Sequence, residues 1–134
     1  MAALHTNVLV RLIVRDDPRQ NAAAMLAIAN VVGTGEAAFV PTTVVLELEW
    51  VLRSRYRLSR GEIEKVIVDL LSSSDVQFSD ERAIEEAVSW FRDWNADFAD
   101  CLHAALAVAA GREPLLTFDR SASNLRAGQL IPET

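Results

Sequence analysis

Short apolar segments alternate with longer helical segments along nearly the whole chain, and this alternation limits the possible folds more than any other feature. Residues 37–40, 76–78 and 115–118 are short apolar runs with turn residues beside them. Such runs are too short for buried helices and predict strands. Strands that alternate with helices favour an α/β fold with a mostly parallel sheet.

The spacing of apolar residues places the individual elements. We expect helices at about 7–14, 19–32, 44–56, 59–71, 80–91 and 97–110, and strands at 2–5, 37–40, 76–78 and 115–118, with 130–131 as a further edge strand. A chain of 134 residues can bury one core. We therefore predict a single domain over residues 1–134, a three-layer α/β/α sandwich around a short, mostly parallel sheet of four to five strands.

Composition indicates a globular protein of the cytoplasm. Half of the residues are apolar (51%), and Cys101 is the single cysteine, so no intramolecular disulfide can form. This usage suits a reducing compartment. No apolar run approaches the roughly 20 residues of a membrane span. We expect no membrane segment.

The charge balance argues against a protein that coats nucleic acid. The net charge is −6, whereas such proteins are usually basic. Four arginines nevertheless gather within residues 53–60: Arg53, Arg55, Arg57 and Arg60. Arginine presents a planar fork that suits phosphate, so this cluster is either a contact to a nucleic-acid backbone or a solvated helix end. Both interpretations stay open from the residues alone.

Acidic residues stand where ligands bind in α/β sheets. Ligands sit beyond the carboxyl ends of the strands. Asp119 ends one predicted strand, Asp97 and Asp100 open the helix at 97–110, and Glu47 lies early in the helix at 44–56. Carboxylates gathered at one rim would repel one another unless a cation neutralised them. Oxygen ligands of this kind suit Mg²⁺ or Mn²⁺.

Simpler interpretations exist for each of these residues. Asp97 could complement a helix dipole, and Asp119 could be a turn residue. Glu47 and Glu49 lie on roughly opposite faces of an apolar helix, so one is solvated. We take Glu47 to be the carboxylate that faces the core side and needs a partner.

Three other residue types receive structural interpretations. We interpret His103 as an ordinary helix residue and Cys101 as a small buried one. The tryptophans are interpreted as core and interface residues and not as a base-stacking platform; they are Trp50, Trp90 and Trp94.

The order of the motifs resembles the PIN-domain family, and within it the VapC-type toxins. The segment 4–11 (LHTNVLVR) resembles that family's opening motif, and Asp16-Asp17-Pro18 follows it as in many VapC toxins. The segment 47–52 (ELEWVL) resembles the one with the family's glutamate. The segments 97–100 (DFAD) and 117–120 (TFDR) resemble its third and fourth acidic motifs. The resemblance covers nearly the whole chain.

The resemblance implies a Mg²⁺- or Mn²⁺-dependent endoribonuclease toxin. It implies that Glu47, Asp100 and Asp119 hold the metal, with Asp97 as an auxiliary ligand. The residues it makes candidates for substrate binding and supporting hydrogen bonds are Thr6, Asn7 and Thr117, to which we add Arg53 and Arg55. The implied partners are a VapB-type antitoxin, an RNA of the tRNA or rRNA class, and a second copy in a homodimer or a larger toxin–antitoxin hetero-oligomer.

One position departs from the family pattern. Where the opening motif has its first aspartate, this chain has His5. Histidine is a poor ligand for Mg²⁺ and removes one negative charge, so we expect weakened metal affinity and little or no cleavage. The histidine would be a selected or engineered substitution, or else a natural change in metal preference.

Two other function classes compete with this one. A catalytically silent PIN-fold binding module is favoured by His5. Another metal-dependent phosphohydrolase with an acidic site would usually place an aspartate nucleophile where His5 stands. The chain has no glycine-rich phosphate loop, which disfavours nucleotide binding.

Overall fold

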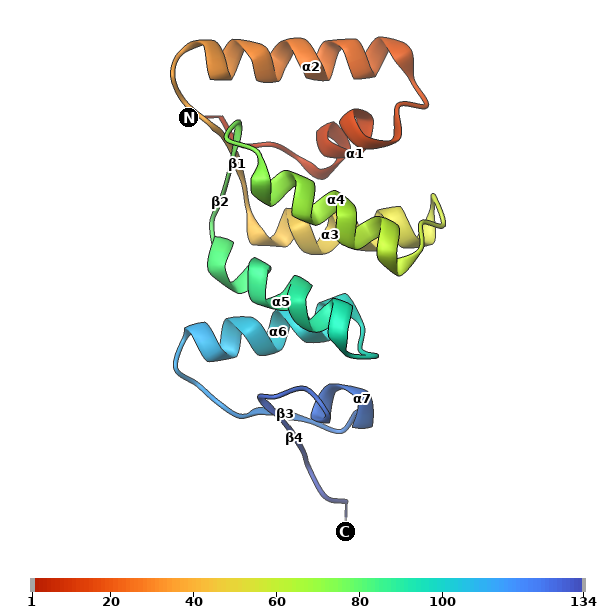
Figure 1. The fold of residues 1–134 in the computed structure, drawn as a ribbon, viewed down its shortest axis with the longest axis vertical. Helices are drawn as coiled ribbons and strands as arrows, with labels where there is room; N and C mark the ends of the chain where they lie inside the picture. Colours follow the sequence, from red (N-terminus) through yellow and green to blue (C-terminus); the bar gives the residue numbers. More distant parts are fainter. Residues whose placement is uncertain (1, 134) are drawn as a thin grey trace. The chain divides into compact units, whose positions relative to one another are not determined.

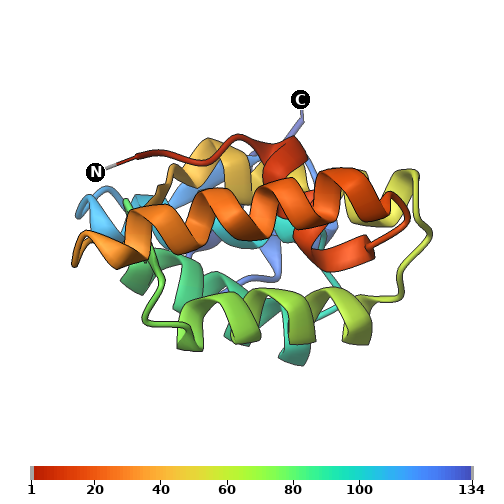
Figure 2. The same ribbon diagram turned by 90° about the horizontal axis from the view of Figure 1, so that it is seen from above.

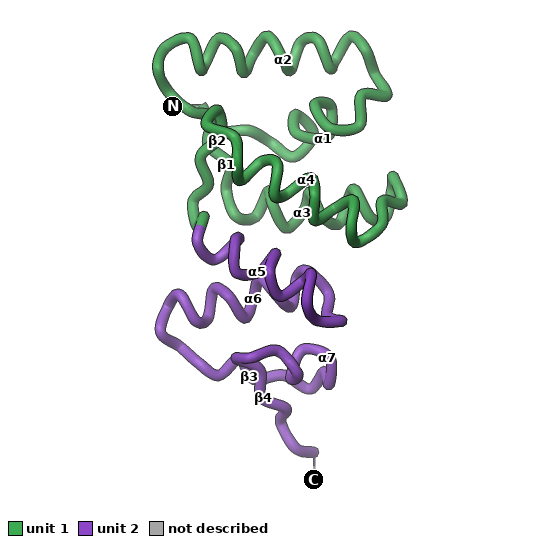
Figure 3. The backbone as a smooth tube through the Cα atoms, viewed as in Figure 1, with its two compact units in different colours: residues 1–81 green, residues 82–134 purple. Residues whose placement is uncertain are grey.

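The computed structural model describes residues 2–133, and these contain seven helices and four strands (Figure 1). The helices are α1 (Thr6–Val14), α2 (Pro18–Gly33), α3 (Thr42–Ser54), α4 (Arg60–Ser72), α5 (Glu81–Asp93), α6 (Phe98–Ala109) and α7 (Arg120–Ser123). The strands are β1 (Ala38–Val40), β2 (Val76–Phe78), β3 (Leu115–Thr117) and β4 (Gly128–Leu130). The chain divides into two compact units, residues 1–81 and 82–134 (Figure 3).

Parallel strand pairing occurs in the first unit. β1 pairs with β2 in a register that joins Ala38 to Val76. On the other side of β1, the chain near the N-terminus forms one parallel bridge, from Ala3 to Phe39, supported by the amide of Leu4 donating to the Phe39 carbonyl at 2.8 Å. The strand expected at 2–5 is therefore reduced to this single bridge. A run of four residues offers too few ladder bonds before α1 begins.

Three helices of the first unit, α1, α3 and α4, bury apolar side chains. α1 lies against α2 and α3, and α4 lies against α3 and β2 (Figures 1 and 2). Their completely buried side chains, at 0–1% exposure, are Leu9, Val45, Leu48, Leu52, Ile63 and Ile67. α4 begins with the expected capping box, in which Ser59 and Glu62 bond reciprocally to each other's backbone amides.

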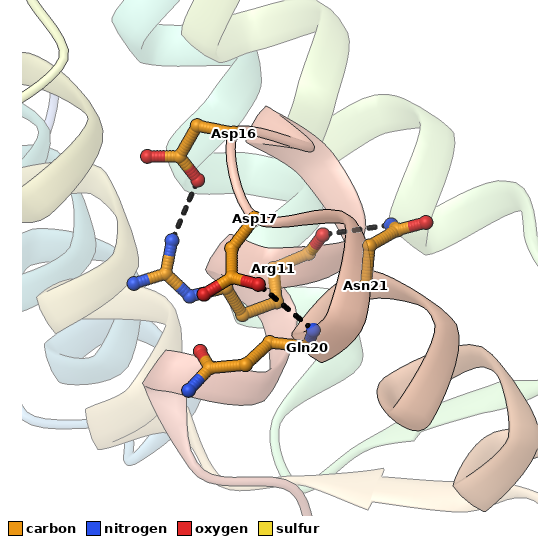
Figure 4. Close-up of polar contacts among 5 residues, drawn as sticks. All are labelled: Arg11, Asp16, Asp17, Gln20 and Asn21. Carbon is orange, nitrogen blue, oxygen red and sulfur yellow. Dashed lines mark hydrogen bonds and ion pairs between the residues drawn. The ribbon is translucent and has the colours of Figure 1, made fainter.

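The turn between α1 and α2 is held by polar contacts (Figure 4). Asp17 caps α2 by accepting from the Gln20 amide at 3.0 Å, and Asn21 donates to the Arg11 carbonyl at 2.8 Å. Asp16 accepts from the Arg11 guanidinium at 2.6 Å. α1 ends at Val14 and α2 begins at Pro18, so the break between the helices expected at about 7–14 and 19–32 is confirmed. Of the sixteen residues of α2, Ala24 alone is buried.

The second unit contains its own parallel pair. β3 pairs with β4 in a register that joins Leu115 to Gly128, and α7 connects the two strands. A Cβ on Gly128 would clash with the Ala122 carbonyl oxygen and come within 2.8 Å of the Ser123 Cα, so glycine is required for this close approach. Phe91 and Phe98 meet edge to face, with ring centroids 5.6 Å apart.

Most of the expected elements are confirmed. The α/β class and the parallel pairing are confirmed, and among residues 2–133 the four strands form two pairs, one in each unit. The last strand begins at Gly128, two residues before the expected start at Leu130. None of the helices within residues 2–133 is both long and apolar enough to span a bilayer.

Candidate functional site

Thr6 and Glu47 connect α1 to α3 inside the first unit. Thr6 is the first residue of α1 and is 3% exposed, and its hydroxyl donates to the Glu47 carboxylate. His5 precedes it as the N-cap of α1. Its Nδ1 accepts from the Asn7 amide at 3.3 Å. The opening motif thus places a hydroxyl, a ring nitrogen and a carboxylate close together.

A pocket of about 280 Å³ opens beside this group. α1 and its cap contribute His5, Asn7 and Arg11 to the wall. α3 and the turn that follows it contribute Glu47, Trp50, Arg55 and Tyr56. The pocket therefore combines a carboxylate, cations and two aromatic rings, all from the first unit.

The buried carboxylate of α3 is Glu49 and not Glu47. Glu49 is 3% exposed, whereas Glu47 belongs to the exposed residues. Arg53, one turn further on, donates from Nε to Glu49 at 2.8 Å and compensates the buried charge. The expectation that Glu47 faces the core side is wrong. Glu47 has a partner, Thr6, on the pocket side of the helix.

The same pair changes the interpretation of the arginine cluster. Arg53 is committed to Glu49, although more than half of its side chain is exposed (54%). Arg55 lines the pocket and forms no ion pair within residues 2–133. Of the two arginines expected to bind substrate, Arg55 is the one that lines this pocket.

Three carboxylates of the second unit interact with one another. Asp97 is the N-cap residue of α6, Asp100 lies in the first turn, and Asp119 follows β3. Partial burial is the main cause that raises the pKa of Asp100, and the charges of Asp119 and then Asp97 raise it further; His103 acts in the opposite direction. Asp100 is therefore near enough to Asp119 and to Asp97 to feel the charge of each.

Asp119 also has the local role of a turn residue. Its carboxylate accepts from the Ser121 amide at 2.8 Å and caps α7. Its own amide donates to the Thr117 hydroxyl at 3.0 Å. Asp97, in contrast, makes no capping hydrogen bond with its side chain. Asp119 and Thr117 thus hold each other at the end of β3.

The donor set within this unit suits a hard cation. Three carboxylates supply oxygen ligands, and the pKa of Asp100 is raised by desolvation first and then by the charges of Asp119 and Asp97, which a cation would offset. As they stand, no three His, Cys, Asp or Glu side chains between residues 2 and 133 are grouped so that they could hold a metal ion. His5 and Glu47 belong to the other unit.

Comparison with known proteins decides the family. The sequence model of the PIN domain matches residues 2–127. The chain belongs to the PIN-domain family. This PIN domain is also similar to a VapC ribonuclease of Aquifex aeolicus (strain VF5), with 29% identity over 86 residues. The similar segment covers 64% of this chain and 64% of that relative, which is less than two thirds of the relative's length.

Sequence reasoning missed two features of the PIN domain's site. The Glu49–Arg53 pair has the spacing of four residues at which helix side chains meet, so the sequence carried a signal for it. The aromatic wall of the pocket had a similar signal, because Trp50 follows Glu47 by three residues on the same helix. The position of Tyr56, beyond the end of α3, had none.

Proposed function

We propose that this PIN domain is a metal-dependent endoribonuclease, the toxin of a VapBC-type pair, weakened or inactivated by His5. The observation that carries the proposal is that Asp100 lies within reach of the charges of Asp119 and Asp97, which raise its pKa in addition to its partial burial. The match to the family over residues 2–127 and the similarity to a VapC ribonuclease support it.

The proposed metal ligands are Asp100, Asp119 and Glu47, with Asp97 as an auxiliary ligand and Mg²⁺ or Mn²⁺ as the ion. When bound, the ion would supply an activated water and stabilise negative charge on the scissile phosphate. Thr6 holds the Glu47 carboxylate in one orientation through its hydroxyl. Thr117 does the same for the backbone that carries Asp119. Because the Asp97 side chain is not used as a cap, its oxygens are available to a cation.

His5 is proposed to lower the activity. A neutral imidazole removes one charge from the ligand set and is a poor ligand for Mg²⁺. Its Nδ1 is already engaged with the Asn7 amide. The native chain, with His5, should therefore bind Mg²⁺ weakly and favour Mn²⁺.

The partners follow from the family. We propose a VapB-type antitoxin, an RNA substrate of the tRNA or rRNA class, a homodimer that the antitoxin can extend to a larger hetero-oligomer, and action in the cytoplasm. Thr6, Asn7, Thr117 and Arg55 are the proposed contacts to substrate or supporting hydrogen bonds. Arg53 is proposed only as an outer contact, because Glu49 holds its Nε.

A second function is favoured by one residue. A silent PIN-fold module that binds RNA or antitoxin without cleavage would need no complete ligand set, and His5 makes the set incomplete. The two proposals differ in the expected effect of His5→Asp: the nuclease should gain cleavage, and the silent module should not.

The test restores that aspartate. The native chain and the His5→Asp variant are incubated with a mixed RNA pool in Mg²⁺ and in Mn²⁺, and metal binding is measured by calorimetry without RNA. We expect His5→Asp to bind Mg²⁺ at least about tenfold more tightly and to cleave. In that background Asp100→Asn and Glu47→Gln should abolish cleavage, while the exposed control Asp69→Asn should not. Equal inactivity of every form, with no gain in metal binding, would contradict the proposal and favour the silent module.

A further inference from the structure

We propose that the pocket beside Glu47 receives one unstacked nucleobase of a single-stranded RNA, with Trp50 as its stacking surface and Arg55 as its phosphate contact. The inference rests on the proposed nuclease function for the class of ligand. It adds what that function leaves open: which residues recognise the RNA, and in which form the RNA is bound.

Trp50 is exposed in a way that a core residue is not. It is 51% exposed and lies on α3, one turn after Glu47, where it lines the pocket. It is therefore not a core residue of the first unit. Indole faces stack with every base, which makes them the usual platform for single strands.

The size of the pocket selects a small occupant. Its volume of about 280 Å³ lies just under the ~300–1,000 Å³ typical of sites for drug-sized ligands. A single base with its sugar is small enough to enter this volume. In a duplex the base would be stacked between its neighbours, so the bound strand must be single or locally unpaired.

The charges on the wall suit a nucleotide. Arg55 has no ion pair among residues 2–133 and offers a complete guanidinium fork to phosphate. Arg11 is held by Asp16, as Figure 4 shows. Desolvation opposes the charge of Arg11, but the hydrogen bond and charge of Asp16 outweigh it and raise its pKa. Arg11 therefore stays charged but has part of its fork occupied, which leaves Arg55 as the main contact.

The floor of the pocket can read a base edge. Asn7 is exposed, and its amide side chain carries both a donor and an acceptor. Asn7 and Arg11 also line a neighbouring pocket of about 520 Å³ between α1 and α2. A strand whose base enters beside Trp50 therefore has a continuing path along α1.

The experiment measures binding separately from cleavage. Fluorescence anisotropy follows a labelled single-stranded RNA of about ten nucleotides with the full chain in EDTA, so that no metal-dependent cleavage occurs. We expect Trp50→Ala to weaken binding about tenfold and Trp50→Phe to retain most of it, because phenylalanine keeps an aromatic face. Trp94→Ala is the matched control, since Trp94 is 46% exposed in the other unit.

The phosphate contact has its own measurement. Arg55→Ala should weaken binding and lower the slope of log affinity against log salt by about one, whereas Arg57→Ala, an exposed neighbour outside the pocket, should not. A duplex of the same sequence should bind at least tenfold more weakly than the single strand. An RNA with one abasic position should bind the native chain more weakly than the intact RNA does. The Trp50→Ala variant should bind the abasic and the intact RNA with nearly equal affinity, because both changes remove the same stacking contact.

The outcomes separate this inference from the proposed function. The proposed base-binding role of the pocket would be contradicted if Trp50→Ala bound RNA with native affinity. It would also be contradicted if the losses from Trp50→Ala and from an abasic position were additive at every position, even if the His5→Asp form cleaves RNA. A change of oligomeric state in Trp50→Ala with unchanged RNA affinity would also overturn it and assign Trp50 to a protein interface. Single-strand binding that depends on Trp50 without cleavage in any variant would support the pocket and contradict the nuclease.

Discussion

Thr6 donates its hydroxyl to Glu47, and this bond joins the start of α1 to the second turn of α3. Thr6 is almost completely buried, while Glu47 faces the pocket. An exposed carboxylate on a helix would otherwise sample several rotamers. The bond therefore fixes the orientation of Glu47 and satisfies the buried hydroxyl of Thr6.

Removal of that hydroxyl should affect function more than stability. Thr6→Val keeps the shape of the buried side chain and should lower the free energy of unfolding by only about 0.5–1.5 kcal/mol. In the His5→Asp background, metal affinity or cleavage should fall about 10- to 100-fold, because the carboxylate loses its orientation. Urea unfolding and cleavage assays give the two values. Thr6→Ser, which retains the hydroxyl, is the control, and equal losses for Val and Ser would contradict the role.

The two arginines of α3 and its following turn should behave differently. Arg53→Ala leaves the buried Glu49 charge uncompensated and should cost about 1–3 kcal/mol of unfolding free energy. Arg55→Ala removes an exposed side chain and should change it by less than about 0.5 kcal/mol. Chemical denaturation of both variants checks this. In the double variant Arg53→Ala/Glu49→Gln, part of the loss should be recovered, and no recovery would mean that Arg53 stabilises the fold by other contacts.

Asp100 should destabilise the folded chain at neutral pH. Its folded pKa is raised, mainly by desolvation and then by Asp119 and Asp97, so the folded state binds its proton more readily than the unfolded state. The charged form therefore costs stability above the folded pKa, and this cost disappears as the pH falls towards the unfolded value of about 3.9. Asp100→Asn should be more stable than the native chain at pH 7, with the difference lost near pH 4.

This comparison is made by urea unfolding without metal, over a series of pH values. Asp93→Asn, an exposed aspartate of α5, is the control and should show no such pattern. A native chain that is more stable than Asp100→Asn at pH 7 in the absence of metal would contradict the prediction that the charge of Asp100 destabilises the folded chain. Added Mn²⁺ should then reverse the order in the His5→Asp background, because the ion compensates the charge.

Two glycines should respond in opposite directions to alanine. Gly128→Ala places a methyl group against the Ala122 carbonyl and should cost about 1–3 kcal/mol or more, because backbone atoms must move. Gly61 lies inside α4 with open space around its Cα, so Gly61→Ala should stabilise by about 0.5–1 kcal/mol. Thermal unfolding of both variants is the measurement. A neutral Gly128→Ala would show that β4 can shift away from α7.

Local sequence signals predicted the helices well because the residues that start each helix and form its apolar face lie within the helix or next to it. The capping box at Ser59, the Asp17-Pro18 start of α2 and the apolar stripe of α5 act over a few residues, so they are readable without a structure. The α/β class follows from the same alternation. The ends of the strands were less predictable, because the pairing of Gly128 with Leu115 depends on a close approach to α7.

The candidate site was predictable in its residue types and less so in its contacts. Glu47, Asp100 and Asp119 could be proposed as one group from strand order, and of these Asp119 lies near enough to Asp100 to raise its pKa, as Asp97 also does. The choice between Glu47 and Glu49 depends on the rotation of α3 about its axis, which an apolar helix with two stripes does not determine. The pocket beside Trp50 depends on the turn after α3, where no periodic pattern exists.

The sparse burial of α2 has an effect on which changes the chain can tolerate. Ala24 is its one buried residue, and Asp17 and Asn21 add hydrogen bonds at its start. Most of its remaining positions can change with little penalty to folding. This stretch is therefore where the sequence is freest to diverge, and where a label or tag can be introduced with the least disturbance to the rest of the first unit.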